Sequence, residues 1–396
     1  MIKKKPLIIW ILVILFGIAA LIRVTGRIYP GIKPSLKSEN TSEYLEEFPK
    51  TNEDLKNTRL NILEDYDIGI YAENLGNPRV MVFDNNERLI VTDTKGGNVY
   101  KVEDLNKDGF SETNTILLEN LNNPHGLVIH DDNLYLAVVD AVYRYKYDVE
   151  VGTVGEPLKI LDLPDTSTKR HKTRFLAIGS DNKLYVSIGS SCDTCIERDE
   201  RIATIMYVNL DGTEEKIFAS GLRNAVYFSF HPETQELYAT EMGRDHLGDN
   251  LPPDEINIVK EGGGYGWPFC YGNKVYDKVF AGVNNCALSV GSFIDLPAHV
   301  APSGIAFAPK SFNDTTNDMF VALHGSWNSS VPVGYKVIRF KYENGTYKNN
   351  PEDFITGFLK DRTAVGRPAG LMFGKDNSLY ISDDKAGVIY KVFKKK

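Results

Sequence analysis

The sequence has little of what a nucleic-acid-binding protein needs. Its 45 lysine and arginine residues are outnumbered by 53 aspartate and glutamate residues, which gives a net charge of −8. The basic residues form no stripe along the 396-residue chain, and no long run of one charge occurs. Proteins that bind nucleic acid usually carry such a basic patch. The composition therefore argues against a nucleic-acid partner.

Cysteine is also scarce, with four residues in the chain. Cys192 and Cys195 form a C-x-x-C pair, and Cys270 and Cys286 are separated by a longer stretch. No histidine stands at ligand spacing beside either pair, which weighs against zinc. The C-x-x-C pair follows a predicted strand, whereas redox motifs of this kind open helices. We predict two structural disulfides in an oxidising compartment, with a zinc site built from all four cysteines as the alternative.

The N-terminal segment is predicted to lie outside the folded domain. Three lysines at residues 3–5 precede an uncharged apolar run at residues 6–22, and a helix of that length covers about 25 Å, the short end for a membrane span. No clear cleavage site follows, so we predict an uncleaved transmembrane helix, with a cleaved signal peptide as the alternative. The lysines favour a single-pass cell-membrane protein whose body is extracytoplasmic. We assign residues 1–24 to the anchor, 25–60 to a polar linker and 61–396 to the folded domain.

What the sequence does contain is a motif that recurs six times. Each copy has a leading Asn-Pro, Arg-Pro or similar pair, then an apolar strand, a turn and two further strands; in the first copy the strands are residues 80–83, 89–93 and 99–102. Six such copies predict an all-β, six-bladed β-propeller. Residues 68–73 are expected to supply the fourth strand of the last blade and close the ring.

The leading residues occupy the same place in every copy. Closure of the ring would therefore bring them together around a central channel, although they are far apart in sequence. The alternative is that they serve only as turn residues. The predicted channel residues are Arg79, His125, Arg174, Asn224 and Arg367.

Residues near these positions have the chemistry of a catalytic site. His171 precedes the first strand of the third copy and is a candidate base. Arg223 and Asn224 lead the fourth copy, where an arginine would meet either an anionic ligand or a salt-bridge partner in a neighbouring blade. Gly243 and Arg244 open a long excursion from that copy, in which backbone carbonyls can approach a metal ion.

A separate stretch has the spacing of a calcium loop. Oxygen-bearing side chains stand at positions 1, 3, 5 and 9, and glycine stands at position 6. Position 12, where such loops carry an acid, holds Thr115. We predict a structural calcium here, with a solvated turn as the alternative. The predicted ligands are Asp104, Asn106, Asp108 and Glu112.

As an ordered set, these motifs resemble a known family. Gly-Arg-Asp-x-Leu-Gly-Asp-x-Leu-Pro-Pro-Asp-Glu-Ile-Asn at residues 243–257, His-Gly-Ser-Trp-Asn at 324–328 and Gly-Arg-Pro at 366–368 follow His171. They are similar to motifs of the soluble glucose/sorbosone dehydrogenases, in particular the sorbosone and pyranose dehydrogenase branch. Members use pyrroloquinoline quinone (PQQ) on a six-bladed propeller. The resemblance covers residues 62–394.

The resemblance implies a PQQ- and calcium-dependent dehydrogenase of sugars, polyols or related alcohols and aldehydes. The base would take a proton from the substrate hydroxyl while hydride passes to PQQ, which then reduces an acceptor that the sequence does not identify. The matching positions are His171 as the base, Arg223, Asn224, His324 and Arg367 as PQQ contacts, and the backbone carbonyls of Gly243 and Arg244 as calcium ligands.

Three positions depart from the glucose enzymes. Ala369 replaces the second arginine of a cofactor-binding pair, His324 replaces a lysine that contacts PQQ, and Arg244 replaces a proline. PQQ carries three carboxylates, so the loss of two cations should weaken its binding unless Arg244 and His324 compensate. Two alternatives follow: a propeller that binds a glycan or protein without redox chemistry, and a calcium-dependent lactonase. The arginine and histidine at the leading positions disfavour the lactonase, which needs a ring of acids and amides around its calcium.

Overall fold

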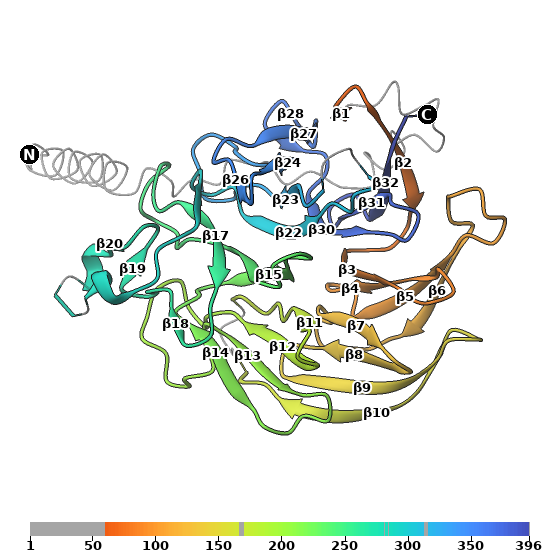
Figure 1. Ribbon diagram of the computed structural model, residues 1–396, viewed down its shortest axis with the longest axis horizontal. Coiled ribbons are helices and arrows are strands. Elements are labelled where there is room, and N and C mark those ends of the chain that lie inside the picture. Colours follow the sequence, from red (N-terminus) through yellow and green to blue (C-terminus); the bar gives the residue numbers. More distant parts are fainter. Residues whose placement is uncertain (1–59, 166–169, 281, 284, 313–315, 396) are drawn as a thin grey trace, which may run out of the picture.

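The chain folds as a six-bladed β-propeller, as the repeat predicts. Six four-stranded antiparallel units surround a common axis (Figure 1). Among the described residues, the helices are the short 3-10 helices η1 (Lys278–Phe280) and η2 (Cys286–Leu288). The computed structural model describes residues 60–165, 170–280, 282–283, 285–312 and 316–395.

Within each blade the first strand is innermost. The innermost strands of neighbouring blades contact one another, except that the innermost strand of blade 4 contacts blade 3 mainly at the second strand of blade 3. From the axis outward, the strands are as follows: in blade 1, β3 (Pro78–Phe83), β4 (Leu89–Asp93), β5 (Asn98–Glu103) and β6 (Thr113–Leu118); in blade 2, β7 (Leu127–His130), β8 (Asn133–Ala137), β9 (Ala141–Asp148) and β10 (Thr153–Asp162); in blade 3, β11 (Leu176–Ile178), β12 (Lys183–Ile188), β13 (Thr204–Asn209) and β14 (Lys216–Ser220); in blade 4, β15 (Ala225–Phe230), β16 (Leu237–Glu241), β17 (Asp254–Val259) and β21 (Ile294–Leu296); in blade 5, β22 (Pro302–Phe307), β23 (Met319–Leu323), β24 (Lys336–Phe340) and β27 (Glu352–Thr356); and in blade 6, β30 (Pro368–Phe373), β31 (Leu379–Asp383), β32 (Val388–Lys394) and β2 (Tyr66–Ala72).

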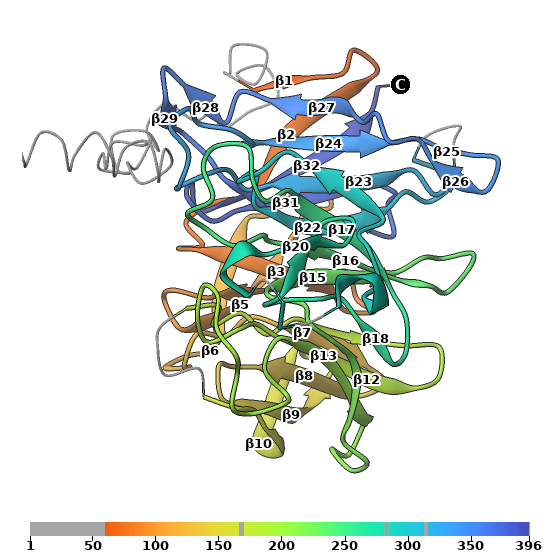
Figure 2. The same cartoon turned by 90° about the vertical axis from the view of Figure 1, so that its left-hand side faces the viewer.

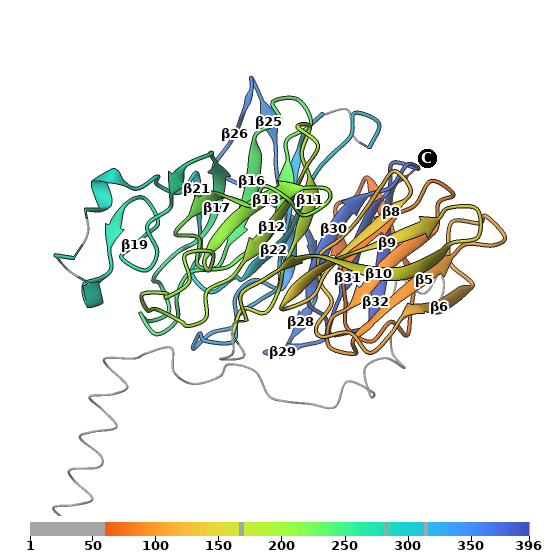
Figure 3. The ribbon, with the colours of Figure 1, turned by 90° about the horizontal axis from the view of Figure 1, so that it is seen from below.

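Short strands extend two blades and form hairpins in the loops. The hairpin of β19 and β20 belongs to a long excursion of blade 4 and stands out at the edge of the molecule (Figure 3). The short strands are β1 (Asn61–Ile62), which pairs with β27; β18 (Gly263–Gly264), which pairs with β14; and the hairpins β19 (Cys270–Tyr271) with β20 (Val275–Tyr276), β25 (Tyr342–Glu343) with β26 (Thr346–Tyr347), and β28 (Leu359–Lys360) with β29 (Thr363–Ala364).

The N-terminal and C-terminal strands of the propeller close the ring together. β2 pairs with β32 antiparallel, with Ile68 opposite Val392 (Figure 2). The predicted closing strand at residues 68–73 is therefore confirmed. This pairing completes blade 6 and gives the last blade the same four strands as the others, so that the ring has no unpaired gap.

The outermost strands of blades 1 to 5 are the part of the fold that the repeat did not predict. Leu161 is the one buried residue among the ten of β10, and β6 has none. Strands β6 and β10 thus lack the buried apolar pattern of an inner strand, whereas β21 and β27 each bury two apolar residues and still fall outside the three-strand repeat. The inner three strands carry that pattern and were predicted.

Apolar faces of adjacent blades pack against each other and form the core. Between blades 2 and 3, for example, buried Tyr135 and Val142 pack with Leu184, Val186 and Met206. Face-to-face packing of this kind fixes each blade against two neighbours. The loops at the ends of the strands are thus carried by a continuous ring.

The antiparallel order of strands decides which loops meet. The first strand of a blade begins, and the second ends, on the same face of the propeller. We call this the site face, because its loops hold most of the predicted site residues; the turns after the first strands form the opposite face. The loops of the site face that concern us are residues 170–175, 189–203, 221–224, 242–253, 324–335, 365–367 and 384–387.

Both predicted disulfides are present. Cys192 pairs with Cys195 and Cys270 pairs with Cys286, which excludes a zinc site made of the four thiols. The predicted anchor at residues 1–24, and the linker apart from residue 60, lie outside the described residues. In the described part of the chain, no helix has the length and apolar character needed to cross a membrane.

Candidate functional site

His171 is held in one tautomer by the loop after β12. Its Nδ1 lies 2.9 Å from the carbonyl oxygen of Ser190 and 2.8 Å from the Ser190 hydroxyl. A carbonyl oxygen can only accept, so Nδ1 carries the hydrogen and Nε2 keeps its lone pair. The His171 backbone is left-handed, with φ of 41°, a conformation that non-glycine residues rarely adopt outside functional or tightly constrained sites.

The surroundings keep this imidazole neutral. Burial, with the positive charge of Arg223 acting in the same direction, lowers the pKa of His171 to about 3. The buried Arg174 guanidinium donates to the His171 carbonyl at 2.9 Å and so fixes the backbone of the loop. Arg174, which was predicted to face the channel, therefore stabilises the backbone of His171. A neutral histidine with a free Nε2 can accept a proton.

Arg223 is buried, with 4% of its surface exposed, and its charge is met by the chain itself. Its Nη2 donates to Asp193 Oδ1 at 2.8 Å and its Nε donates to the Asp193 carbonyl at 2.9 Å. Asp193 lies between the two cysteines of the C-x-x-C disulfide. The salt bridge to a neighbouring blade, one of the two alternatives for this arginine, is therefore present.

Asn224 lies beside His171. A Cβ added at Gly189 would stand 2.6 Å from the His171 Cβ and 2.8 Å from the Asn224 Oδ1, so both side chains converge on that glycine. The backbone N–H of Asn224 donates to Glu241 Oε1 at 2.9 Å. The structure therefore brings together the three predicted residues of blades 3 and 4.

A small cavity next to Arg223 is lined by carboxyl groups and by Gly243 and Arg244. Burial raises the pKa of Glu241 well above its ordinary value, and the nearby charge of Glu255 raises it further. Among the described residues, Glu241 Oε2 has no hydrogen-bond partner. Sequence reasoning missed Glu241, because an acid at the end of a strand looks like an ordinary surface residue. Only the fold places it opposite Glu255.

A second group of charged residues joins blades 5, 6 and 1. Arg367 donates to His324 Nδ1 at 3.2 Å, so His324 Nε2 carries a hydrogen and donates to Asp384 Oδ1 at 2.9 Å. Asp384 also forms a salt bridge with Arg79. Burial raises the pKa of Asp384, but Arg79 and His324 outweigh burial and hold it below its ordinary value. Arg79 and the neutral His324 thus contact one carboxylate that the sequence did not single out, and Arg367 is connected to it through His324.

The two groups lie on the same face and are linked. Asn328, in the loop that follows His324, hydrogen-bonds to Asp245, which is 3.7 Å from Arg223. At the centre, the buried His125 is affected by the charges of Arg79, Arg174 and Asp384. The leading residues of different blades therefore do meet around the axis, as the ring predicted.

Ala369 supplies no charge where the glucose enzymes have the second arginine of the cofactor-binding pair. It is fully buried in β30, and its carbonyl accepts a hydrogen bond from Ser303 at 2.9 Å. Arg367 alone of the Gly-Arg-Pro-Ala segment presents a charge, and its guanidinium packs over the Tyr335 ring at 5.0 Å.

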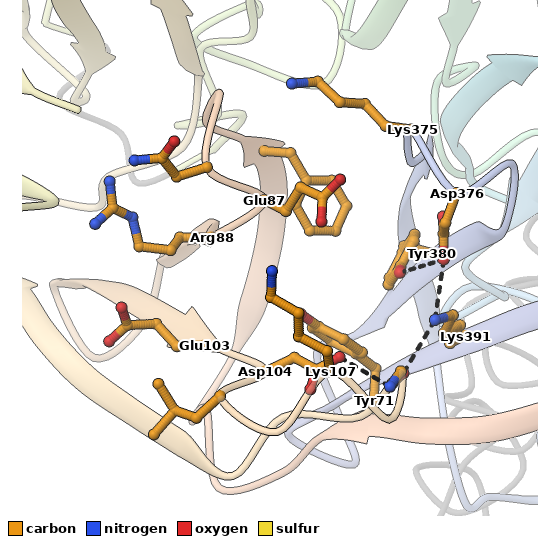
Figure 4. Close-up of a pocket in the computed structure, with 14 residues that line it drawn as sticks. Tyr71, Glu87, Arg88, Glu103, Asp104, Lys107, Lys375, Asp376, Tyr380 and Lys391 are labelled. Carbon is orange, nitrogen blue, oxygen red and sulfur yellow. Dashed lines mark hydrogen bonds and ion pairs between the residues drawn. The ribbon is translucent and has the colours of Figure 1, made fainter. Parts of the chain in front are cut away.

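The predicted calcium loop is on the opposite face. Carboxylate oxygens of Asp104, Asp108 and Glu112 lie within 4.8 Å of one another. Asn106 is engaged within the loop, because its Oδ1 accepts from the Asp108 amide at 2.7 Å. The loop borders a cavity of about 440 Å³ between blades 1 and 6, where Lys391 forms a salt bridge with Asp376 (Figure 4). This site is separate from His171.

Comparison with known proteins places the chain in a family. A family model described as TrAA12-like matches residues 60–280 and 281–395. The chain belongs to the TrAA12-like family. This TrAA12-like protein is 35% identical over 303 residues to an uncharacterized protein of Borreliella burgdorferi, covering 71% of this chain and 78% of the relative. It is 26% identical over 377 residues to a pyrroloquinoline quinone-dependent sugar dehydrogenase of Hypocrea jecorina, covering 79% and 84%.

Solved structures support the fold of this TrAA12-like protein. A Trichoderma reesei protein of carbohydrate-active enzyme family AA12, solved with iodide, superposes with a TM-score of 0.75 at 22% identity. The match covers 85% of this chain and 98% of that chain. The resemblance to PQQ-dependent sugar dehydrogenases that the motifs indicated is confirmed.

Proposed function

We propose that this protein is a PQQ- and calcium-dependent dehydrogenase that oxidises sugars or related alcohols and aldehydes. The observation that carries the proposal is a neutral His171, with Nε2 available, beside Arg223 and Asn224 in a family whose relatives include a PQQ-dependent sugar dehydrogenase. A base with a low pKa remains unprotonated across the physiological range.

The charged residues of the site face fit an acidic cofactor. Arg223, Asn224, His324 and Arg367 would hold PQQ, and arginine forks suit its carboxylates. The two arginines already have partners: Arg223 pairs with Asp193, and Arg367 donates to His324 and to the Gly325 carbonyl. The neutral His324 donates to Asp384. Binding of PQQ therefore exchanges carboxylates around these cations instead of neutralising free charges.

The cavity beside Arg223 fits a cation. Asp254 lies outside this cavity, because its two oxygens accept from the amides of Gly243 and Ala301. Glu241 and Glu255 stand opposite one another on β16 and β17 and line the cavity, and burial raises the pKa of both carboxyls. A calcium ion there, also held by the carbonyls of Gly243 and Arg244, would stabilise their ionised forms. When bound, PQQ would accept the hydride and calcium would polarise the accepting carbonyl.

The chain's own contribution to the reaction is positioning and proton transfer. Ser190 keeps the His171 hydrogen on Nδ1, so Nε2 takes the proton of the substrate hydroxyl. Arg174 and Ser190 hold the base from two sides, which limits its motion during the transfer.

PQQ titration followed by absorbance, together with dye reduction, tests the proposal. We expect saturable PQQ binding that depends on calcium, and dye reduction with an aldose, ketoaldehyde or polyol. Binding without turnover on any of these substrates would favour the non-catalytic binding propeller. Absence of PQQ binding would overturn the proposal and leave the lactonase to be tested with calcium alone.

We also propose a structural calcium in the loop of residues 104–112. The convergence of Asp104, Asp108 and Glu112 supports it, together with the Asp104 Oδ1, which lacks a hydrogen-bond partner among the described residues. A calcium ion would be bound by the carboxylate oxygens of this loop.

For localisation, we propose an extracytoplasmic propeller anchored in the cell membrane by residues 1–24. The uncharged run at residues 6–22 supports the anchor, and two disulfides suit an oxidising compartment. Fractionation and protease treatment of intact cells test it. Release of the protein by osmotic shock would contradict the anchor, and protection from external protease after removal of any outer membrane would contradict the orientation.

A further inference from the structure

The excursion of blade 4 between β18 and β21 forms a small projecting unit, which we call the lobe (residues 270–280, 282–283 and 285–290). It stands clear of the blades at one edge of the molecule in two perpendicular views (Figures 1 and 3). Its surface is unusual for a protein with a net charge of −8. The proposed reaction gives no role to the exposed residues of the lobe.

The inner side of the lobe is firmly built. Cys270 and Cys286 are buried and joined by a disulfide. Asp277 is buried and forms a salt bridge with Arg244 at 2.8 Å, and the rings of Phe269 and Phe280 meet edge to face with centroids 5.3 Å apart. The outer side chains are therefore presented by a fixed scaffold.

The outer side of the lobe carries a cluster of exposed apolar side chains. Five large apolar side chains within a 14-residue stretch are about half exposed or more, whereas isolated exposed apolar residues are normal. They are Val275 (47% exposed), Tyr276 (46%), Val279 (64%), Val283 (62%) and Leu288 (83%).

The charge of the lobe is of one sign. Lys274 and Lys278 are exposed among the apolar side chains. Asp277 is the one acid in residues 270–290, and its charge is buried against Arg244. The lobe therefore combines apolar side chains with uncompensated positive charge, the combination found in segments that rest in the headgroup region of anionic membranes.

We propose that the lobe docks on an anionic lipid surface. The lysines match lipid phosphates, the apolar side chains enter the boundary between headgroups and acyl chains, and the tyrosine suits that boundary. The same chain carries a membrane-length apolar run at residues 6–22, which would keep a membrane within reach. Because Asp277 connects the lobe to Arg244, docking would hold the site face near the membrane surface.

An environment-sensitive thiol-reactive fluorophore tests this in the full chain. All four native cysteines are in disulfides, so Val279→Cys provides one labelling site, and Ile116→Cys, at a 54% exposed residue of β6, provides a matched control. On vesicles that contain phosphatidylglycerol we expect the label at 279 to become brighter and shift to the blue, and the label at 116 to remain unchanged. An unchanged label at 279, or equal changes at both sites, would overturn the proposal.

Charge reversal separates lipid docking from self-association. Lys274→Glu with Lys278→Glu should lower the ratio of inserted to free lobe at least about 30-fold, since each lysine near an anionic surface contributes about fivefold and each new glutamate adds repulsion. The control is Lys341→Glu with Lys348→Glu, which makes the same change of net charge on exposed lysines of blade 5. A signal at 279 that rises with protein concentration in the absence of vesicles would show a second copy as the partner and would also overturn the proposal.

Discussion

At the scale of single residues, the cations of the site are defined by the acids that accompany them. Arg223 is paired with Asp193, and Arg79 is paired with Asp384, which also accepts a hydrogen bond from the neutral His324. Buried charges require such partners, because an isolated one would be strongly destabilising. Cofactor binding at this face is therefore a competition between carboxylates.

His171 is the residue on which turnover should depend most. We expect His171→Ala to lower kcat by about 10²- to 10⁴-fold, the usual contribution of a general base. PQQ binding should stay within a few-fold, because the proposed cofactor contacts are other residues. Steady-state kinetics and PQQ absorbance measure the two quantities, and full turnover in the variant would remove His171 from the role of base.

Asp193 should restrain PQQ binding. Asp193→Asn removes the charge that occupies Arg223, so we expect PQQ to bind about tenfold more tightly, in line with the strength of a hydrogen bond to a charged group. Asp199→Asn is the control, because Asp199 pairs with Arg201 in the same loop. Weaker PQQ binding by Asp193→Asn would mean that Asp193 orients Arg223 for the cofactor.

His125 should make stability depend on pH. Burial, together with the positive charge of Arg79, lowers its pKa to about 3, whereas an unfolded histidine has a pKa of about 6.5. The unfolded state therefore binds more protons below pH 6.5, and stability is complete above that pH and is lost as pH falls towards 3.

We expect His125→Phe to reduce the slope of the unfolding free energy against pH by about 1.4 kcal/mol per pH unit between pH 4.5 and 6. Urea unfolding at several pH values measures it. The readout is the slope, so a uniform loss of stability from the larger ring does not obscure the result. An unchanged slope would show that His125 is protonated in the fold.

At the scale of elements, the loops carry the residues of the site, and the direction of the strands determines on which face each loop lies. The C-x-x-C loop after β12 delivers Asp193 to an arginine of the next blade, and the excursion after β16 delivers Gly243 and Arg244. Antiparallel pairing places both loops on the site face, whereas the loop after β5 lies on the opposite face. Two predicted metal sites are thereby kept apart.

The loop of residues 104–112 should respond to calcium independently of the site face. At about 100 times Kd, calcium bound there would stabilise the fold by about 2.7 kcal/mol, so the melting temperature should rise. Asp104→Asn with Asp108→Asn should remove this part of the rise. The control is Asp131→Asn with Asp132→Asn, at exposed acids of blade 2. Equal calcium responses in both double variants would contradict the structural calcium.

At the scale of the whole molecule, stability depends on closure of the ring. β2 completes blade 6 from the other end of the folded chain, so its apolar side chains join blades that are otherwise separate in sequence. We expect Ile68→Ala, at a residue 5% exposed, to cost about 2 to 5 kcal/mol in urea unfolding. Ile116→Ala, at a residue 54% exposed, should change stability by less than about 0.5 kcal/mol. Similar effects of the two variants would contradict this role of β2.

The sequence by itself determined the number of blades, their inner strands and the closing strand, because buried apolar residues recur at a fixed place in each copy. It also determined the residues that match family positions, since motifs such as His-Gly-Ser-Trp-Asn are local. Outer strands such as β6 and β10 escaped prediction because, with one face to solvent and little burial, they carry no comparable pattern.

Only the tertiary structure decided which charges meet. Nothing near Arg223 in sequence indicates Asp193, and nothing near His324 indicates Asp384, because each pair joins residues 30 or more positions apart. The tautomer of His171 likewise depends on Ser190, which the fold brings to its Nδ1. Burial of a strand leaves a repeated apolar pattern in the local sequence. The partner of a buried charge is instead whichever opposite charge the fold places beside it.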